Sequence, residues 1–492
     1  MEFKKQYINR PALPLGAVMM LIFAIGFGQS SLAWAEDKPT ISKLLLRPTA
    51  EPVPALKYQL LPSYIDCTPG NAALDYGRIL VQWKSVEREK LLKKIEKWRE
   101  MPLEKLPREE IRHMLDEQHW VFEGLTRASR RDTCEWQLPL RESSNPFEIL
   151  LPELQQLRTL TYLLDVKARL EIAEGRFDDA VQTLQCGYGM ARQIAEGPLL
   201  VYALVGMAVT DVMTKRVEEL IAQPCSPNMY WALTMLPRPT VNIQKAIAME
   251  INSFEMLFPE LRDIETTPGT VRQWQGILDR MYEDRQIALW MPKAGKNINR
   301  IALMALVAVE YPHAKKVLIE GGLSSKTVEA MPVAQVVALD TVGQYKIIRD
   351  DLFKWFGLPY WQAREGLDAM DKQLRTARIR GVRNELVAML LPALSSCKLA
   401  EARCERNVAI LRTIEAVRMH ASTNNGRSPS ELNKISVVPL PIDPMTGKPF
   451  AYELKGDTAT INAPAPPGVT GKNIHKKVEI QLLKTEDKRN MP

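Results

Sequence analysis

The densest cluster of possible metal ligands is the stretch EEIRHMLDEQHW, which begins at Glu109. Within it, Glu110 and His113 have E-x-x-H spacing, and Asp116 and His119 repeat that spacing with Asp. A helix would place each pair on one face, as in di-iron bundles. Such a centre needs a second E-x-x-H and further Glu residues from other helices, and the chain has only five His. We therefore interpret the stretch as a charged helix surface.

The motifs of nucleophilic and phosphate chemistry are missing or incomplete. G-x-S-x-G is absent, and the S-x-x-K spacing of Ser395 and Lys398 has no S-D-N or K-T-G after it. The stretch MTGKP lacks the upstream Gly of a Walker loop and has Pro449 where Ser or Thr is needed. These motifs predict neither a nucleophile nor a phosphate site.

The remaining titratable candidates have simpler structural interpretations. Asp443 and Asp457 could supply oxygen ligands to calcium, but no alternating D-x-D run accompanies them, which favours turn capping. His313 and His475 lie in Lys-rich, loop-like segments, and His420 ends a predicted helix. We assign no catalytic, cofactor-binding or metal-binding residue, and we expect no cofactor.

The elements that would have to position any site are mostly helical. The clearest is a helical hairpin, because apolar residues step by three or four along two successive faces. They are Leu157, Leu160, Leu164, Ala168 and Ile172, then Phe177, Ala180, Leu184, Tyr188 and Ala191. Gly175 supplies the left-handed residue between the helices, and Asp178 and Asp179 complement the second helix dipole. Ala173, Phe177 and Ala180 fit part of a tetratricopeptide unit, but no second copy follows.

A nearly continuous apolar run follows from Pro198 to Met213. It is too short to span a membrane and contains Asp211, so we predict a buried core helix. Prolines then bracket a short aromatic helix after Pro227. Further helical patterns cover Asn252 to Phe258, Val271 to Trp290, Ile301 to Val309, Val333 to Trp355 and Pro359 to Leu394. The sequence thus predicts a mainly α protein of helical hairpins with TPR-like packing.

The C-terminal region changes pattern. A helix over NVAILRTIEAVRMHASTNN ends at Asn425-Gly426, and FAYEL and TATINA alternate as two strands around Gly456-Asp457. VEIQLL is a candidate third strand. Asp443-Pro444 starts a turn, Gly447 can take positive φ, and Pro449 enters an edge strand. We predict a small α+β module: a helix and an antiparallel β-hairpin.

The N-terminus has the pattern of an export signal. Lys4, Lys5 and Arg10 precede an apolar run, and Ala33 and Ala35 give A-x-A spacing, so we expect cleavage after Ala35. An uncleaved membrane anchor is the alternative, because the uncharged stretch is long enough to span. The expected division is a signal peptide (1–35), an extended lead (36–69), a helical domain (70–400), the helix and β-hairpin module (401–484) and a disordered tail (485–492), with the main boundary near 396–403.

The six cysteines would lie in an oxidising compartment if the signal is functional, and an even number permits full pairing. Cys397 and Cys404 are nearest in sequence, but seven residues of helix would separate them by about 10 Å, so they can pair only if the helix breaks. No C-x-x-C motif supports a redox or zinc site. The pairing stays open.

The charge pattern argues against nucleic acid as a partner. The net charge is only +7 over 492 residues, and Lys and Arg are interspersed with Asp and Glu. A nucleic-acid-binding surface is expected to concentrate positive charge on one face.

Several stretches in combination resemble a family of uncharacterised exported proteins of planctomycete bacteria. They are LLPSYIDCTPGNAALDYGRILVQW, CEWQLPLRESSNPFEILLPELQQLR, ARLEIAEGRFDDAVQTLQCG, IAEGPLLVYALVGMAV, LIAQPCSPNMYWALTMLPRP and PIDPMTGKPFAYEL. The resemblance implies a bacterial cell-envelope protein and brings no known reaction. NNGRSPSEL and DPMTGKPFAY are also loosely similar to the end of type II secretion pseudopilins, although a pseudopilin is short and begins with a prepilin helix.

The leading functional hypothesis is an exported, non-enzymatic helical scaffold that binds another envelope protein in the periplasm or cell envelope. It touches the membrane only if the N-terminal segment is uncleaved. One alternative is an envelope enzyme or ligand-binding protein whose distant residues, such as Glu110, His113 and Asp211, converge on one pocket. Another is a secretion or pilus-associated component that acts through the C-terminal module.

Overall fold

The structure is a computed structural model, and it describes residues 39–83, 85–138, 151–252, 261, 262, 264, 269–283, 300–378, 385–471 and 473–483. The expected signal peptide and tail lie outside the described residues, as does most of the helix expected over 252–258. The protein is mainly helical with a small β-sheet, which confirms the predicted fold class. None of the described helices is long and apolar enough to cross a membrane.

Contacts divide the chain into two units. Among the described residues, 247–398 belong to the first unit, and the second unit groups segments from 22–138, 150–246 and 399–492. This grouping differs from the expected division, because the lead and the C-terminal module belong to the same unit as the helical hairpin. The expected boundary near 396–403 includes the change of unit at Lys398, but it lies within one continuous helix.

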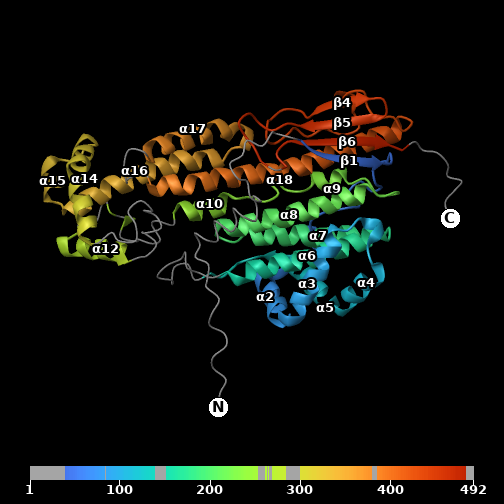
Figure 1. The fold of residues 1–492 in the computed structure, drawn as a ribbon, viewed down its shortest axis with the longest axis horizontal. Coiled ribbons are helices and arrows are strands. Elements are labelled where there is room, and N and C mark those ends of the chain that lie inside the picture. Colours follow the sequence, from blue (N-terminus) through green and yellow to red (C-terminus); the bar gives the residue numbers. More distant parts are fainter. Residues whose placement is uncertain are drawn as a thin grey trace, which may run out of the picture. The chain divides into compact units, whose positions relative to one another are not determined.

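The predicted helical hairpin forms the centre of the second unit. Helices α6 (Pro152–Ala173) and α7 (Phe177–Ala195) lie side by side with α8 (Leu200–Ile221), and Gly175 joins the first two with a φ of 71° (Figure 1). Helix α8 is the predicted core helix, with most of its residues buried. The short aromatic helix is α9 (Tyr230–Thr234). These predictions are confirmed.

Four shorter helices that precede the hairpin in sequence pack against it. They are α2 (Ala72–Gln82), α3 (Ser85–Glu100), α4 (Arg108–Glu117) and α5 (His119–Ser129). Asn71 caps α2 by accepting from the backbone N–H of Ala73, as its residue type predicts. A buried ion network ties α3, α6 and α8 together: Asp165 pairs with Arg99 and with Arg216.

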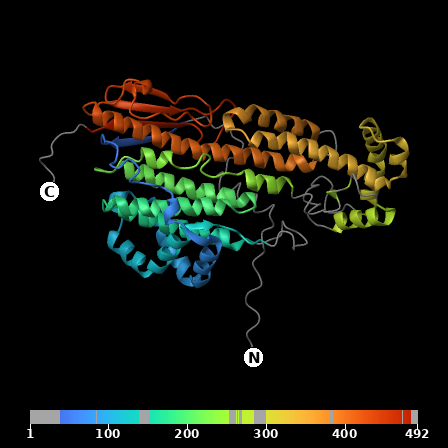
Figure 2. The ribbon, with the colours of Figure 1, turned by 180° about the vertical axis from the view of Figure 1, so that it is seen from behind.

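A four-stranded sheet completes this unit, in the order β1-β6-β5-β4 (Figure 1), and Figure 2 shows its strands from behind. The predicted hairpin is β4 (Ala451–Lys455) and β5 (Thr458–Ala463), and the candidate third strand is β6 (Lys476–Leu482). Strand β1 (Thr40–Leu46) lies in the segment that we expected to be an extended lead; it pairs in parallel with β6 over its whole length. A second, two-stranded sheet joins β2 (Thr68–Asn71) to β3 (Arg131–Thr133).

Helix α18 (Glu385–Thr423) supports the sheet. Its buried residues Ala416, Val417 and Met419 pack with Ile435 and Val438 and contact partly buried residues of β4 and β6. The predicted C-terminal helix is thus the last part of a 39-residue helix, which ends before the positive-φ pair Asn425-Gly426. Because this helix does not break, Cys397 and Cys404 stay apart, and no disulfide joins any of the cysteines, all of which lie in the described part of the chain.

The turn over residues 443–449 is confirmed, but Asp443 does more than cap it. Its carboxylate accepts from the backbone N–H of Met445 (2.9 Å), and it also holds Arg406 of α18 through two hydrogen bonds. Arg406 is completely buried and donates further to the carbonyl oxygens of Ile474 (2.6 Å) and Pro464 (2.8 Å). One helix side chain therefore fixes both the turn at Asp443 and the connection between β5 and β6.

The first unit contains helices and no strand among its described residues. Its elements are α12 (Val271–Glu283), α14 (Arg300–Glu320), α15 (Ser325–Ala330), α16 (Val333–Phe356), α17 (Tyr360–Arg378) and the start of α18, while α10 (Gln244–Ile251) crosses into it. The helical pattern expected from Pro359 to Leu394 contains α17 and the start of α18. His313 lies inside α14, beside Pro312, so its assignment to a loop-like segment was wrong.

Candidate functional site

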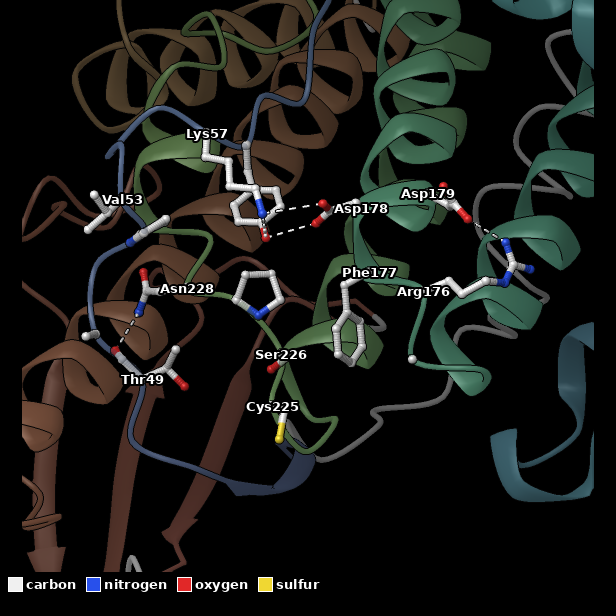
Figure 3. A pocket seen from close by; sticks show the side chains of 15 residues that line it. Thr49, Val53, Lys57, Arg176, Phe177, Asp178, Asp179, Cys225, Ser226 and Asn228 are labelled. Atoms are coloured by element: carbon white, nitrogen blue, oxygen red, sulfur yellow. Dashed lines mark hydrogen bonds and ion pairs between the residues drawn. The ribbon is translucent and has the colours of Figure 1, made fainter. Parts of the chain in front are cut away.

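An open pocket of about 590 Å³ lies in the second unit at the turn of the helical hairpin (Figure 3). Three segments that are distant in sequence line it: residues 49–58 after β1, residues 175–179 between α6 and α7, and residues 225–228 after α8. The charged residues among them are two cations, Lys57 and Arg176, and two anions, Asp178 and Asp179.

Lys57, Tyr58 and Asp178 form a polar triad on one side of the pocket. The Tyr58 hydroxyl donates to Asp178 Oδ1 at 3.0 Å, and Lys57 Nζ donates to the Tyr58 oxygen at 3.0 Å. Lys57 Nζ also lies 3.4 Å from Asp178 Oδ2. The hydrogen bond with Tyr58, followed by the neighbouring charges, raises the pKa of Lys57 above its ordinary value. Lys57 is therefore a permanent cation at neutral pH.

Arg176 and Asp179 occupy the other side of the hairpin turn. Arg176 Nη1 donates to Asp179 Oδ2 at 2.7 Å, and its other nitrogens donate to Glu174. Figure 3 shows this pair on the far side of Phe177 from the Lys57 cluster. Both cations of the pocket are thus partnered by carboxylates and remain partly exposed to solvent.

Buried groups behind the pocket hold its other two segments in place. Arg418 of α18 donates to the Arg47 carbonyl (3.0 Å), to Thr49 Oγ1 (2.7 Å) and to Ser226. Glu415, which pairs with Arg418, accepts from the backbone N–H of Met229 at 3.1 Å. Burial raises the pKa of Glu415 despite the attraction of Arg418. The segments 47–49 and 226–229 are therefore fixed to one helix.

Two side chains of the third segment could serve as nucleophiles, but their surroundings do not activate them. Ser226 Oγ donates to the Ile221 carbonyl (3.1 Å) and accepts from Arg418, and the serine is buried. Cys225 is exposed and has a φ of 60°, a conformation that non-glycine residues adopt infrequently. No His lines the pocket, and none of its described carboxylates contacts either residue. The arrangement supports binding better than covalent chemistry.

The metal-like cluster does not assemble in the structure. The helix breaks at Gln118, so Asp116 and His119 belong to different helices, and the expectation that they share one helix face was wrong. Glu110 pairs with Lys94 at 2.8 Å, and the exposed His113 lies 3.5 Å from Glu117. No group of three or more His, Cys, Asp or Glu among the described residues is arranged to hold a metal ion.

Asp211 belongs to a separate polar cluster between α8, α18 and β6. It accepts from Asn407 (3.0 Å) and from the Cys404 thiol (3.4 Å), and Lys476 donates to Asn407 at 2.7 Å. Burial raises the pKa of the Cys404 thiol, followed by the nearby Asp211 charge, so the thiol stays protonated at neutral pH. The cluster binds three elements together, and Glu110 and His113 make their contacts elsewhere.

The other sequence candidates have structural contacts. Lys398 donates to the Phe356 carbonyl, His475 contacts Asn462 Oδ1 at 3.1 Å, and His420 lies in the last turn of α18. Asp457 lies in the turn between β4 and β5 and is exposed. Sequence reasoning singled out Asp178 and Asp179 only for the helix dipole and did not find the pocket, because Lys57 and Tyr58 carry no motif.

Comparison of the chain with protein-family models, with curated proteins and with solved structures found no match.

Proposed function

We propose that the protein is a non-enzymatic helical scaffold of the bacterial cell envelope that binds a segment of another envelope protein in the pocket at the hairpin turn. The observation that carries this proposal is the composition of the pocket. Its two cations and two anions are already paired with one another or with neighbouring carboxylates. A pocket with this balance has no preference for a strongly anionic or cationic ligand.

A polar peptide segment suits such a site. A peptide presents N–H donors, C=O acceptors and side chains of both charges. Each of these groups can replace one partner of the exposed ion pairs Lys57–Asp178 and Arg176–Asp179. The rim also contains main chain: residues 49–53 run along the pocket, held from behind by Arg418. The pocket is open to solvent and its lining segments are held in place, so a segment of another protein can enter it without a rearrangement of the pocket.

The enzyme alternative finds less support in this pocket. A hydrolytic or transfer site needs a nucleophile within hydrogen-bond reach of a base. The described lining residues include no such pair, and Glu110, His113 and Asp211 contact different partners.

The test is recovery of partners from the envelope fraction of the host. The chain from Glu36, with an affinity tag, is cross-linked and purified, and its partners are measured by quantitative mass spectrometry. Lys57→Glu places a second carboxylate beside Asp178, so we expect it to reduce a near-stoichiometric protein partner by about tenfold, a loss of about 1.4 kcal/mol in binding.

Lys94→Glu is the matched control, because Lys94 of α3 also forms an exposed ion pair, with Glu110 of α4. The partner should be retained in this variant. Equal recovery with both variants would contradict the pocket as the binding site, and a bound small molecule with no protein partner would favour the enzyme or ligand-binding alternative. A pseudopilin-like partner would favour the secretion-associated alternative.

A further inference from the structure

Strand β1 is an edge strand with one hydrogen-bonding side unpaired. Thr40 donates its backbone N–H to the His475 carbonyl, and the Leu46 carbonyl accepts from Leu483. In a parallel pair, alternate residues bond to the neighbouring strand, so Thr40, Ser42, Leu44 and Leu46 face β6. The N–H and C=O groups of Ile41, Lys43 and Leu45 therefore point away from the sheet, and no described residue bonds to them.

The side chains at these three positions are also exposed. Ile41 is 50% exposed and Leu45 is 52% exposed, and they stand two residues on either side of Lys43. Alternate residues of a strand share one face, so the three form an apolar–basic–apolar row on the outer face of the sheet. Edge strands are usually shortened, bulged or interrupted by proline. Strand β1 has seven residues, a continuous register and no proline.

We propose that a second copy of this chain pairs with this edge, β1 against β1, in an antiparallel arrangement about a two-fold axis at Lys43. Ile41 then lies opposite Leu45 of the other copy, and Leu45 lies opposite its Ile41. The outward N–H and C=O groups of the three residues form three mutually bonded pairs. The two sheets become one continuous eight-stranded sheet.

The symmetry of the row is what favours a second copy over an unrelated strand. Reversing the row Ile41-Lys43-Leu45 about its centre returns apolar, basic and apolar positions, so the exposed apolar side chains cover each other. The one unfavourable contact is between the two Lys43 side chains. Glu479 of the neighbouring β6 lies 3.8 Å from Lys43 and reduces this repulsion.

The opposite edge of the sheet is less suited to such pairing. Strand β4 has five residues, follows Pro449, and carries the charged residues Glu453 and Lys455 on one face. Pairing of β1 with β4 of another copy would also not close, and it would continue into an open filament. The two-fold arrangement predicts a dimer and no larger species.

The test is sedimentation velocity on the chain from Glu36, which retains every residue that the structure describes. A single-strand contact buries little surface, so we expect a monomer–dimer equilibrium with a dissociation constant of about 10 to 100 µM. Hydrogen exchange measured below and above this concentration should show added protection at the amides of Ile41, Lys43 and Leu45. A monomer at all concentrations, or open-ended growth, would overturn the proposal.

Substitutions of two lysines with similarly exposed side chains, one on each edge strand, test whether β1 forms the dimer contact. Lys43→Glu sets two carboxylates against each other beside Glu479, and should weaken the dimer at least about fivefold. Lys455→Glu alters an equally exposed lysine on the other edge strand (77% against 79% exposed side chain) and should leave the dimer unchanged. Leu45→Pro removes an outward N–H that does not bond to β6, so a folded but monomeric variant is expected. A dimer that survives Leu45→Pro would show that another surface pairs the chains.

Discussion

At the scale of single residues, the contact between Arg406 and Asp443 organises the C-terminal module. Both side chains are buried, and the arginine uses its remaining donors on two carbonyl groups at opposite ends of the connection between β5 and β6. A buried charge whose partner is removed destabilises a protein strongly, because its desolvation is no longer compensated. This makes Asp443 very different from Asp457, which also lies in a turn of the module but is exposed.

Asp443→Asn should therefore lower the free energy of unfolding by about 3 to 5 kcal/mol. The amide oxygen of the asparagine can still accept from the Met445 N–H, so the turn keeps this hydrogen bond. The loss of stability therefore reports the removal of the charge that pairs with Arg406. Asp457→Asn is the control, and it should change stability by less than about 0.5 kcal/mol. Denaturant titration measures both, and similar values for the two variants would contradict the role of the buried pair.

The sequence predicted the turn at Asp443 but not its partner. Asp followed by Pro, with Gly447 at positive φ, is a local signal, and the local geometry agrees with it. The ion pair is a contact between positions 37 residues apart, and nothing in the local pattern of the helix distinguishes Arg406 from its other arginines. The pocket residues Lys57 and Tyr58 were missed for the same reason.

At the scale of elements, the sequence pattern predicted that the helices form but did not predict which helices pack against each other. Periodic apolar residues and Gly175 identified α6 and α7, and the apolar run identified α8. The close approach of α7 and α8 depends on Gly206, where a Cβ atom would lie 2.7 Å from the Ala191 carbonyl oxygen. The helical pattern was predicted only from Ile301 to Val309, whereas α14 continues to Glu320 with Pro312 inside it, although a proline usually ends a helix.

Gly206→Ala should lower the free energy of unfolding by about 1 to 3 kcal/mol, because the backbone atom that it meets cannot move aside. Gly77→Ala in α2 should do the reverse and stabilise by about 0.5 to 1 kcal/mol, since a Cβ there meets nothing within 4 Å and alanine favours the helix. Thermal unfolding of the two variants checks the signs. Equal shifts in one direction would show that helix propensity alone governs both positions.

At the scale of the whole molecule, the sheet contains the earliest described strand. Sequence patterning assigned the lead to a separate extended region because β1 has no neighbouring strand to form a hairpin with. Its partner, β6, lies at the other end of the chain, and parallel pairing of distant strands leaves no local signal. The C-terminal module is thus incomplete without the N-terminal lead.

A chain that begins at Arg47 lacks β1 and the buried Leu46 but keeps the Arg47 carbonyl that Arg418 binds. Compared with the chain from Glu36, it should lose about 5 to 10 °C in the melting temperature of the second unit. Differential scanning calorimetry measures this, and Val437→Ala, at an exposed position outside the sheet in the same unit, is the control with little expected change. An unchanged melting temperature in the truncated chain would mean that β1 adds no stability to the sheet.

The pairing of β1 with β6 also has a consequence in time. Thr40 and Asn473, which contact each other at the start of this pair, are 433 residues apart. At a synthesis rate of about 5 to 20 residues per second, the first strand is made about 20 to 90 s before the strand that will accept it. The sheet therefore cannot close before β6 has been made. A chain that terminates before β6 leaves the apolar strand β1 unpaired. Quality-control proteases can act on that difference between chains with and without a closed sheet.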